Sequence, residues 1–175
     1  MKQQSAQQRR ARVLDAALPE FAEFGFHGAT TARIAESVGI SQSYVMHLFG
    51  SKKNLFMESM RTCSERLVEH LKAVPDSDDT LNSLSCAYQL LMREQPDLMK
   101  FQLQGWAAAA QDDEVRDACA EQFRVLWFTI ADKLDLDRGT AAPLMAALSF
   151  FNVVVTLGIQ DDQGCAVAGL IQNFQ

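Results

Sequence analysis

The sequence lacks the usual signals of a β protein or of a membrane-spanning one. Its only β-branched run is VVV at 153–155, which lies inside a longer helical pattern, so we expect no sheet. The longest apolar run, at 144–159, is interrupted by Ser149 and Asn152 and is shorter than the roughly 20 residues that cross a bilayer. We therefore expect an all-α protein in which this run is a buried helix and no segment spans a membrane.

Cysteine pairs and catalytic motifs are also missing. The cysteines, Cys63, Cys86, Cys119 and Cys165, form no C-x-x-C pair and have no histidine at metal-ligand spacing, so no metal site is expected. There is no glycine-rich phosphate loop and no triad of catalytic side chains, and the acidic residues at 112–114 are typical of a helix start. We therefore expect a protein that is not an enzyme and that binds no cofactor.

What is present is the composition of a folded, soluble protein, with 48% hydrophobic and 22% charged residues. The first twelve residues are polar and lack the apolar core of a secretory signal, so we expect the chain in the cytoplasm. The net charge of −6 is uneven: residues 1–60 carry 7 − 5 = +2, and the other 115 carry 9 − 17 = −8. Only the first region is suited to approach a polyanion.

The spacing of apolar residues predicts a series of helices. Threonine or serine caps precede the short ones, Thr30 or Thr31 and then Ser41, and Gly39 is suited to the left-handed turn between them. Pro19 falls inside the first helix and predicts a kink there, unless a new helix begins at that point. The expected helices lie at about 9–24, 31–38, 42–49, 52–74, 80–95, 96–111, 113–134 and 140–159.

The segment SQSYVMHLF at 41–49 has two chemically different faces when it is drawn as a helix. At about 100° per residue, Val45, Leu48 and Phe49 form an apolar stripe on one side. The opposite side has no charged residue, unlike an ordinary solvated face, and every side chain on it can donate, accept or stack. This outward face consists of Gln42, Ser43, Tyr44, Met46 and His47.

Two short helices joined by a tight turn that contains glycine are typical of a helix-turn-helix, whose second helix lies in the DNA major groove. Glutamine can pair with adenine edges, serine can bond to several bases, and tyrosine and methionine can touch the thymine methyl group. Lys52 and Lys53 follow at a helix start, where phosphates bind well. Lys2, Arg9, Arg10 and Arg12 are expected in a flexible arm. Each of these interpretations has an alternative. The helix at 41–49 could be a surface helix that only packs, the two lysines could lie at a solvated helix start, and the basic N-terminal residues could form a disordered tail.

The stretch GATTARIAESVGISQSYVMHLFGSKKNLF resembles the DNA-binding region of the TetR family of transcriptional regulators. That family's pattern has Thr-Thr, Ile-Ala, a Gly-Val/Ile-Ser turn, an aromatic Tyr-x-His-Phe, and Lys followed by Leu-Phe. The resemblance covers about residues 9–60. Its matching residues are Thr30, Thr31, Ile34, Ala35, Gly39, Ile40, Ser41, Phe49, Lys52, Leu55 and Phe56.

The resemblance implies which side chains approach DNA, by position in the motif. They are Thr31, Arg33, Gln42, Ser43, Tyr44, His47 and Lys52. Two positions depart from the family pattern: Met46 replaces a tyrosine and Leu48 replaces a histidine. Because a methionine cannot donate a hydrogen bond to phosphate, Tyr44 and His47 are expected to supply part of that contact.

For the rest of the chain the resemblance implies architecture only, a helical bundle that binds a small molecule and forms a homodimer. The last long helix and the apolar piece at 165–174 are the expected dimer interface, with Phe150, Phe151, Val154 and Leu157 as candidates and burial inside the monomer as the alternative. Aromatic and thioether side chains suit a pocket for an apolar or aromatic effector, although a plain core is the alternative. The pocket candidates are Met92, Phe101, Trp106, Phe123 and Trp127, with Gln102, Gln104 and Thr129 as possible orienting groups.

The sequence therefore predicts a helix-turn-helix domain of three helices at 1–56 and a ligand-binding and dimerisation bundle at 57–175. The predicted function is that of a ligand-responsive repressor that binds a palindromic DNA operator as a dimer. The main alternative is a helical interaction protein whose helix-turn-helix no longer binds DNA, with an enzyme as the least favoured class.

Overall fold

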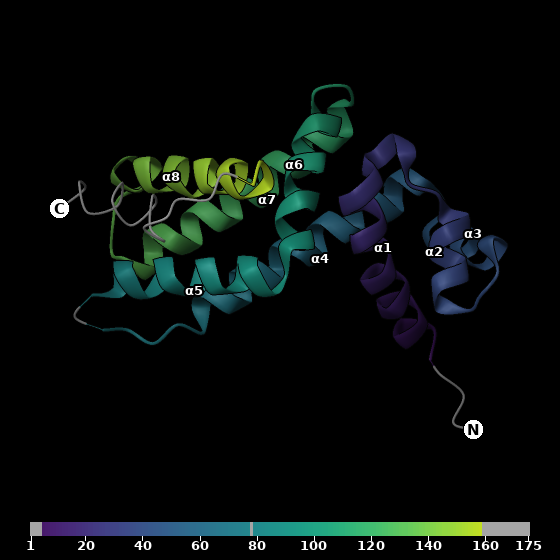
Figure 1. Ribbon diagram of the computed structural model, residues 1–175, viewed down its shortest axis with the longest axis horizontal. Helices are drawn as coiled ribbons and strands as arrows, with labels where there is room; N and C mark the ends of the chain where they lie inside the picture. Colours follow the sequence, from purple (N-terminus) through teal and green to yellow (C-terminus); the bar gives the residue numbers. More distant parts are fainter. Residues whose placement is uncertain (1–4, 78, 159–175) are drawn as a thin grey trace.

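The computed structural model describes residues 5–77 and 79–158, and these form eight α-helices and no strand. The all-α prediction is confirmed. Figure 1 shows an elongated molecule with α2 and α3 at one end, a bundle at the other, and α1, α4 and α6 between them. The helices are α1 (Ala6–Gly28), α2 (Thr31–Val38), α3 (Gln42–Phe49), α4 (Lys52–Lys72), α5 (Thr80–Glu94), α6 (Pro96–Ala109), α7 (Asp113–Lys133) and α8 (Arg138–Thr156).

Side-chain caps fix where the N-terminal helices begin. Ser5, Thr30, Ser41 and Ser51 each accept a hydrogen bond from the backbone N–H three residues later, which satisfies one of the free donors of the first turn. Between α2 and α3, Gly39 takes the left-handed conformation at φ 70°, as the sequence predicts. The short helices are therefore held at a defined angle by local chemistry.

The break in α1 lies at Gly25 rather than at Pro19. Between Ala6 and Gly28, only Gly25 has non-helical backbone angles, with φ 65° and ψ −177°. The positive φ is what favours glycine here, because a β-carbon at Gly25 would meet only the end of the Gln104 side chain on α6, which can move aside. Pro19 is exposed and the helix continues through it at helical backbone angles, so α1 is not interrupted there, and a bend at Pro19 stays a prediction.

Three phenylalanines join the two ends of the molecule. Phe21 of α1 lies edge-on to Phe56 of α4, with centroids 4.9 Å apart, and it stacks on Phe101 of α6 at 5.8 Å. Phe56 and Phe101 are themselves in edge contact at 5.2 Å, and all three rings are fully buried. The boundary predicted between residues 56 and 57 lies inside the continuous helix α4, which therefore belongs to both regions.

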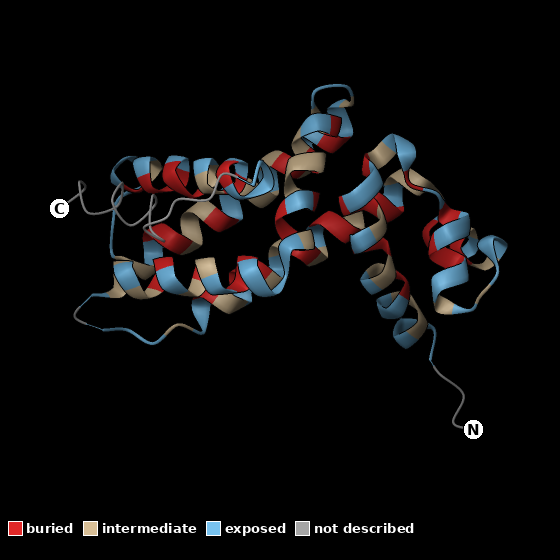
Figure 2. Ribbon diagram, viewed as in Figure 1, coloured by how far each residue is buried: buried red, intermediate tan, exposed pale blue. Residues whose placement is uncertain are grey.

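The bundle consists of α5, α7 and α8 packed with α4 and α6, and Figure 2 shows its buried residues on the inward sides of these helices. The predicted starts at Thr80, Pro96 and Asp113 are confirmed. Of the described helices, only α8 is long and apolar enough to cross a membrane by length and composition, and 33% of its apolar window is buried. The prediction that this run is a buried helix is thus only half right, because one face of α8 is apolar and exposed. The piece at 165–174 lies outside the described residues.

Candidate functional site

Helix α3 presents the two faces that its sequence predicts. Val45 and Phe49 are buried, and Leu48 is partly buried against the same core. On the opposite side Gln42, Ser43 and His47 are exposed, whereas Tyr44 and Met46 on the flanks are half-buried. The outward face of α3 is thus uncharged and rich in hydrogen-bonding groups. Figure 1 places α3 at the end of the molecule farthest from the bundle.

Two side chains of this face are held by neighbours. Nε2 of Gln42 donates to the hydroxyl of Thr31, at 3.0 Å, and Thr31 is itself buried. The structure thus gives Thr31 a role in orienting Gln42, and direct contact of Thr31 with DNA stays a prediction. The Tyr44 ring stacks on His47 at 6.2 Å, and the Arg9 guanidinium lies 5.4 Å from its centroid. The face is therefore partly preorganised.

Arg33 and Lys52, both predicted to approach DNA, make internal contacts. Arg33 pairs with Glu20 at 2.6 Å, donates to the carbonyl of Gly28 at 2.7 Å and lies over Phe24. Lys52 donates from Nζ to the carbonyls of His27 and Ala29, at 3.3 and 3.2 Å. Both cations therefore hold the end of α1 against α2 and α4. A contact with phosphate would have to share or replace these bonds.

The arginines near the N-terminus are not in a flexible arm, because Arg9, Arg10 and Arg12 all lie within α1. Arg10 crosses to α3, where it donates to the carbonyl of Leu48 and lies 4.3 Å from the Phe49 ring centroid, and it also pairs with Glu58 of α4. Charge-assisted bonds of this kind fix orientation well. Arg10 therefore anchors the C-terminal end of α3, and the arm predicted for these residues is wrong.

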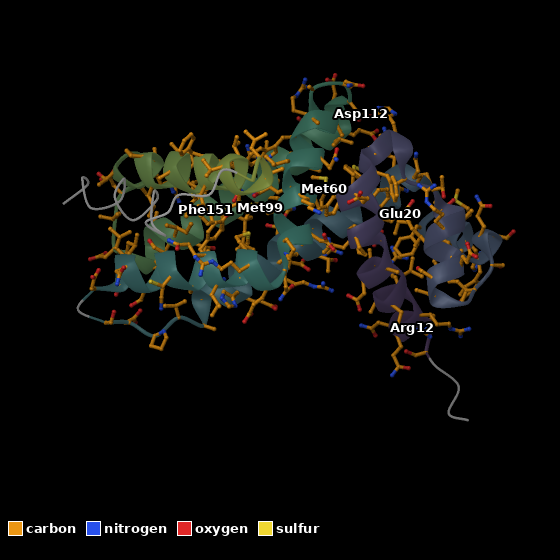
Figure 3. All side chains as sticks on the ribbon, in the orientation of Figure 1. Arg12, Glu20, Met60, Met99, Asp112 and Phe151 are labelled. Carbon is orange, nitrogen blue, oxygen red and sulfur yellow. The ribbon has the colours of Figure 1, made fainter. Side chains whose placement is uncertain are left out.

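Lys53 connects the helix-turn-helix region to the bundle. Its Nζ lies 3.2 Å from Oδ2 of Asp112 and 2.5 Å from Oε2 of Glu114, at the start of α7. Figure 3 shows Asp112 at the tip of the α6–α7 turn, close to the end of α1. The carboxylates raise the pKa of Lys53, and backbone and lysine hydrogen bonds lower that of Asp112. A shift of α7 would therefore be felt at the first turn of α4, next to α3.

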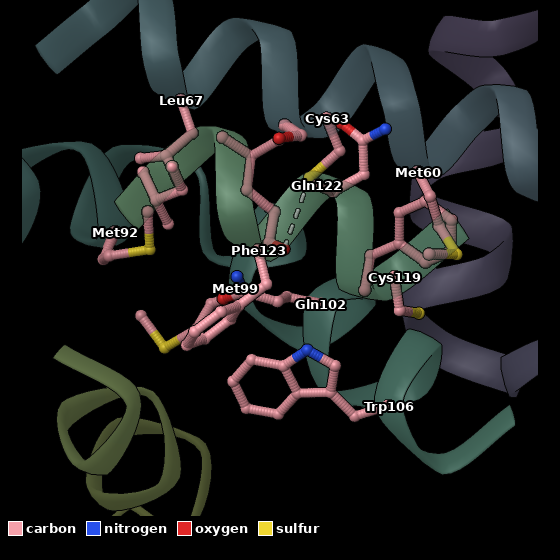
Figure 4. A pocket seen from close by; sticks show the side chains of 14 residues that line it. Met60, Cys63, Leu67, Met92, Met99, Gln102, Trp106, Cys119, Gln122 and Phe123 are labelled. Atoms are coloured by element: carbon pink, nitrogen blue, oxygen red, sulfur yellow. Dashed lines mark hydrogen bonds between the residues drawn. The ribbon is translucent and has the colours of Figure 1, made fainter. Parts of the chain in front are cut away.

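A cavity of about 50 Å³ lies between α4, α5, α6 and α7. Its lining is mostly apolar, and Figure 4 shows side chains from several helices converging on it. Four of the five predicted pocket residues line it, namely Met92, Phe101, Trp106 and Phe123. The remaining lining residues are Met60, Cys63, Ser64, Leu67, Leu98, Met99, Gln102, Cys119, Gln122 and Leu126.

Trp127, the fifth predicted pocket residue, lies outside this cavity. It borders a shallow, more open hollow with Trp106 and Phe123, and its indole N–H donates to the carbonyl of Arg138 at 3.0 Å. This bond fastens α7 to the start of α8, which gives Trp127 a structural role.

No charged side chain is among the described residues that line the cavity. Burial raises the pKa of the Cys63 thiol to about 12 and that of Cys119 to about 11, so both stay protonated at neutral pH. Thiols with such pKa values are poor nucleophiles and poor metal ligands. Among the described residues there is also no group of three or more His, Cys, Asp or Glu side chains that could hold a metal ion.

Three polar residues form a buried network beside the cavity. The hydroxyl of Tyr88 on α5 donates to Oδ1 of Asn152 on α8, and Nδ2 of Asn152 donates to Oε1 of Gln102 on α6, both at 2.5 Å. Tyr88 and Asn152 are fully buried. The network ties the cavity wall to α8 through hydrogen bonds, which are directional, rather than through apolar contact alone.

The outward face of α8 carries a stripe of exposed apolar residues, which are alternately three and four residues apart. These seam residues are Pro143, Ala146, Phe150, Val153 and Leu157. Such spacing is typical of the contact line between paired helices. Phe150 and Leu157, two of the predicted interface residues, are 51% and 67% exposed and belong to this seam.

The other two predicted interface residues lie inside the monomer. Val154 is buried, and Phe151 is partly buried against Tyr88, with ring centroids 6.1 Å apart. Burial inside the monomer was the alternative that the sequence left open, and it applies to these two side chains. Val153 is a seam residue that the sequence analysis missed, although the three-four spacing from Pro143 to Leu157 is visible in the sequence.

Residues 13–58 match the sequence profile of the bacterial regulatory proteins of the tetR family. The chain is 41% identical over 61 residues to the HTH-type transcriptional repressor AcnR of Corynebacterium diphtheriae, which is 35% of this chain and 32% of that protein. It is 32% identical over 127 residues to the HTH-type transcriptional repressor Rv1474c of Mycobacterium tuberculosis, 62% of this chain and 65% of the relative. The matches thus span less than two thirds of either relative.

A solved structure extends the similarity to the whole fold. It is a TetR family member, SCO1917 of Streptomyces coelicolor A3, with a TM-score of 0.78 over 95% of this chain and 96% of that one, at 20% identity. At that identity the similarity concerns the arrangement of helices, including the bundle that the sequence profile does not cover.

Proposed function

Because the chain belongs to the tetR family of bacterial regulatory proteins through residues 13–58, we propose that it is a ligand-responsive transcriptional repressor of the cytoplasm. It binds a palindromic DNA operator as a homodimer, and a small molecule in the cavity releases it. The observation that carries this proposal is the outward face of α3, which is uncharged, exposed and able to donate and accept hydrogen bonds.

The chemistry of the outward face of α3 suits the recognition of DNA bases. Gln42 presents an amide beside the exposed hydroxyl of Ser43, and amides and hydroxyls pair with base edges in the major groove. The stacked Tyr44 and His47 lie next to them, where they can contact bases or phosphates. Thr31, Arg33 and Lys52 complete the proposed DNA surface, the last two through phosphates.

Dimerisation through the α8 seam places two such faces on one DNA duplex. An isologous pair of α8 helices covers Phe150, Val153 and Leu157 on both subunits. The seam also explains why an apolar helix is exposed here, since a helix in lipid would be apolar on every side. Two recognition helices about 34–36 Å apart then meet successive major grooves of a palindromic operator.

Release by an effector follows from the position of the cavity. It lies between α4, α6 and α7, and α4 leads directly to α3. An effector larger than the cavity must displace its flexible methionines and part the helices around it. That displacement reaches α4 through the Phe21–Phe56–Phe101 cluster and through Lys53 with Asp112 and Glu114. The effector thereby favours a dimer whose α3 spacing no longer suits the operator.

The proposal is tested by gel shift against the DNA upstream of the protein's own gene, at two salt concentrations. We expect binding that survives competitor DNA and weakens with salt, as phosphate contacts require. Met46 and Leu48 depart from the family pattern, so the competing function is an interaction protein without DNA affinity. Absence of sequence-preferring binding at both salt concentrations would favour that competitor.

A further inference from the structure

The cavity presents hydrogen-bond donors in a mostly apolar wall. Two polar groups are fixed there, the side-chain amide of Gln102 and the indole N–H of Trp106. In Figure 4 the indole ring of Trp106 lies beneath Gln102, with its nitrogen on the side that faces Gln102. What these two groups can bind depends on which atom of the Gln102 amide is left for a ligand.

The network behind Gln102 decides that orientation. Tyr88 is fully buried and its hydroxyl proton has one acceptor among the described residues, Oδ1 of Asn152. The Asn152 amide must then turn Nδ2 toward Gln102, which accepts through Oε1. The reverse orientation of both amides would leave the buried Tyr88 proton without an acceptor, which is costly. Gln102 is therefore left with Nε2, a donor, and no acceptor for it is present among the described residues.

Trp106 adds a second donor and no acceptor. An indole N–H can only donate, and within residues 5–77 and 79–158 no group accepts from it. Its ring is held against Phe123 in edge contact, with centroids 6.4 Å apart. By contrast Gln122, the other glutamine of the lining, belongs to no hydrogen-bonded network of described residues, so its amide is free to turn.

The lining also limits the charge of a ligand. It contains no ionised side chain, and the high pKa values of Cys63 and Cys119 keep both thiols neutral. An ionised carboxylate or ammonium would enter without a partner charge, which is unfavourable in an apolar site. A neutral acceptor, such as the oxygen of a ketone, ester, lactone or amide, meets two donors instead.

We propose that the effector is a neutral, mainly apolar compound carrying a carbonyl-type acceptor, and that Nε2 of Gln102 and Nε1 of Trp106 donate to that oxygen. Asn152 and Tyr88 are positioning residues, which act through Gln102. The inference rests on the proposed effector role of the cavity. It further links the ligand to α8, since the network that orients Gln102 passes through Asn152.

The test uses two probes of the same shape on the full-length protein without DNA, cyclohexanone with its carbonyl oxygen and methylenecyclohexane with a CH₂ group instead. Affinities are measured by saturation-transfer NMR. We expect the wild type to bind the ketone about tenfold more tightly, the effect of one or two good hydrogen bonds. Each of Gln102→Leu and Trp106→Phe should lower that ratio at least about threefold, and the double variant should bring it to about one.

Two controls separate the chemistry from loss of structure. Gln122→Leu removes the other glutamine of the lining and should keep the tenfold ratio, whereas Tyr88→Phe should lower it by freeing the Asn152 amide. Because each result is a ratio within one variant, a general loosening of the cavity cancels.

Each contrary result identifies what is wrong. A wild-type ratio near one, or a tenfold ratio that persists in the double variant, would overturn the inference while leaving the cavity as an effector site. Equally tight binding of cyclohexanecarboxylate would overturn the neutral class. If neither neutral probe binds, the effector role of the cavity fails as well. Operator binding is measured separately by gel shift. It tests the DNA-binding part of the proposed function independently of these probe experiments.

Discussion

Helices α3 and α8 both present an outward face without charge, yet the two faces differ in every other respect. On α3 the exposed groups are amide, hydroxyl and imidazole, whereas on α8 they are aliphatic and aromatic carbons. A partner covered with hydrogen-bonding edges, such as DNA, suits the first. A partner that only needs to exclude water, such as a second copy of the same helix, suits the second. In the proposed function both uncharged faces are contact surfaces, and their polar groups determine which kind of partner each one suits.

Placing a charge on the α8 seam should have the largest effect. Val153 and Val155 are 39% and 40% exposed, but they lie two residues apart and so point to opposite sides of the helix. We expect Val153→Glu to give a monomer, by analytical ultracentrifugation, and to weaken operator binding about 100-fold or more through loss of the second half-site contact. Val155→Glu is the matched control and should remain a dimer with full affinity. Dissociation by both variants or by neither would mean that the seam is not the interface.

Removing one polar group from the α3 face should have the next largest effect. Gln42→Ala should cost about 2 kcal/mol of operator binding and relax the base preference at one position, because a good amide–base pair contributes about 1–3 kcal/mol. Fluorescence anisotropy with a set of operator variants measures both. Gln95→Ala, an exposed glutamine at the α5–α6 junction, is the control. Thr31→Val, which removes the hydroxyl that tethers Gln42 but keeps Gln42 itself, should weaken binding less.

Restoring the family residue at Met46 should strengthen DNA binding modestly. Met46 is half-buried at the edge of the α3 face, and a tyrosine hydroxyl there can donate to phosphate. We expect Met46→Tyr to tighten binding by about 1 kcal/mol for one hydrogen bond. Since no charge is added, the salt dependence should be unchanged. Weaker binding in the variant would indicate that methionine itself contacts a base.

The smallest effect concerns the bridge between the two regions. Lys53→Met removes the ion pairs to Asp112 and Glu114 but leaves α3 and the cavity intact. We expect nearly unchanged operator affinity and a higher effector concentration for release, measured in the same gel-shift assay. Lys72→Met, at the far end of α4, is the control. If Lys53→Met loses DNA affinity but not the response, the lysine contacts phosphate rather than transmitting the signal.

The helix-turn-helix region was largely predictable because its determinants are local. Caps at Thr30 and Ser41, the left-handed Gly39 and the apolar stripe on α3 all act within a few residues, so sequence spacing specifies them. Pro19 does not interrupt α1, because its fixed φ is one that helical residues already have. The packing of α1 against α6, by contrast, cannot be read from local spacing.

The bundle was predictable only as a set of helices and a group of candidate pocket residues. The bridge from Lys53 joins residues 59 positions apart, and the bond from Asn152 to Gln102 spans 50. No local spacing records such pairs, because they depend on how whole helices pack. Trp127 and Val154 illustrate the same limit: both are large, apolar and at helical spacing, and only packing decides which side of their helices faces the cavity, the core or a partner.

The account depends most on two α3 faces reading one DNA site together, and hydroxyl-radical footprinting on the upstream DNA tests this directly. We expect two protected patches related by two-fold symmetry, their centres one helical turn or about 34–36 Å apart, and loss of both in Val153→Glu. A single protected patch, or full protection by the monomeric variant, would contradict the account.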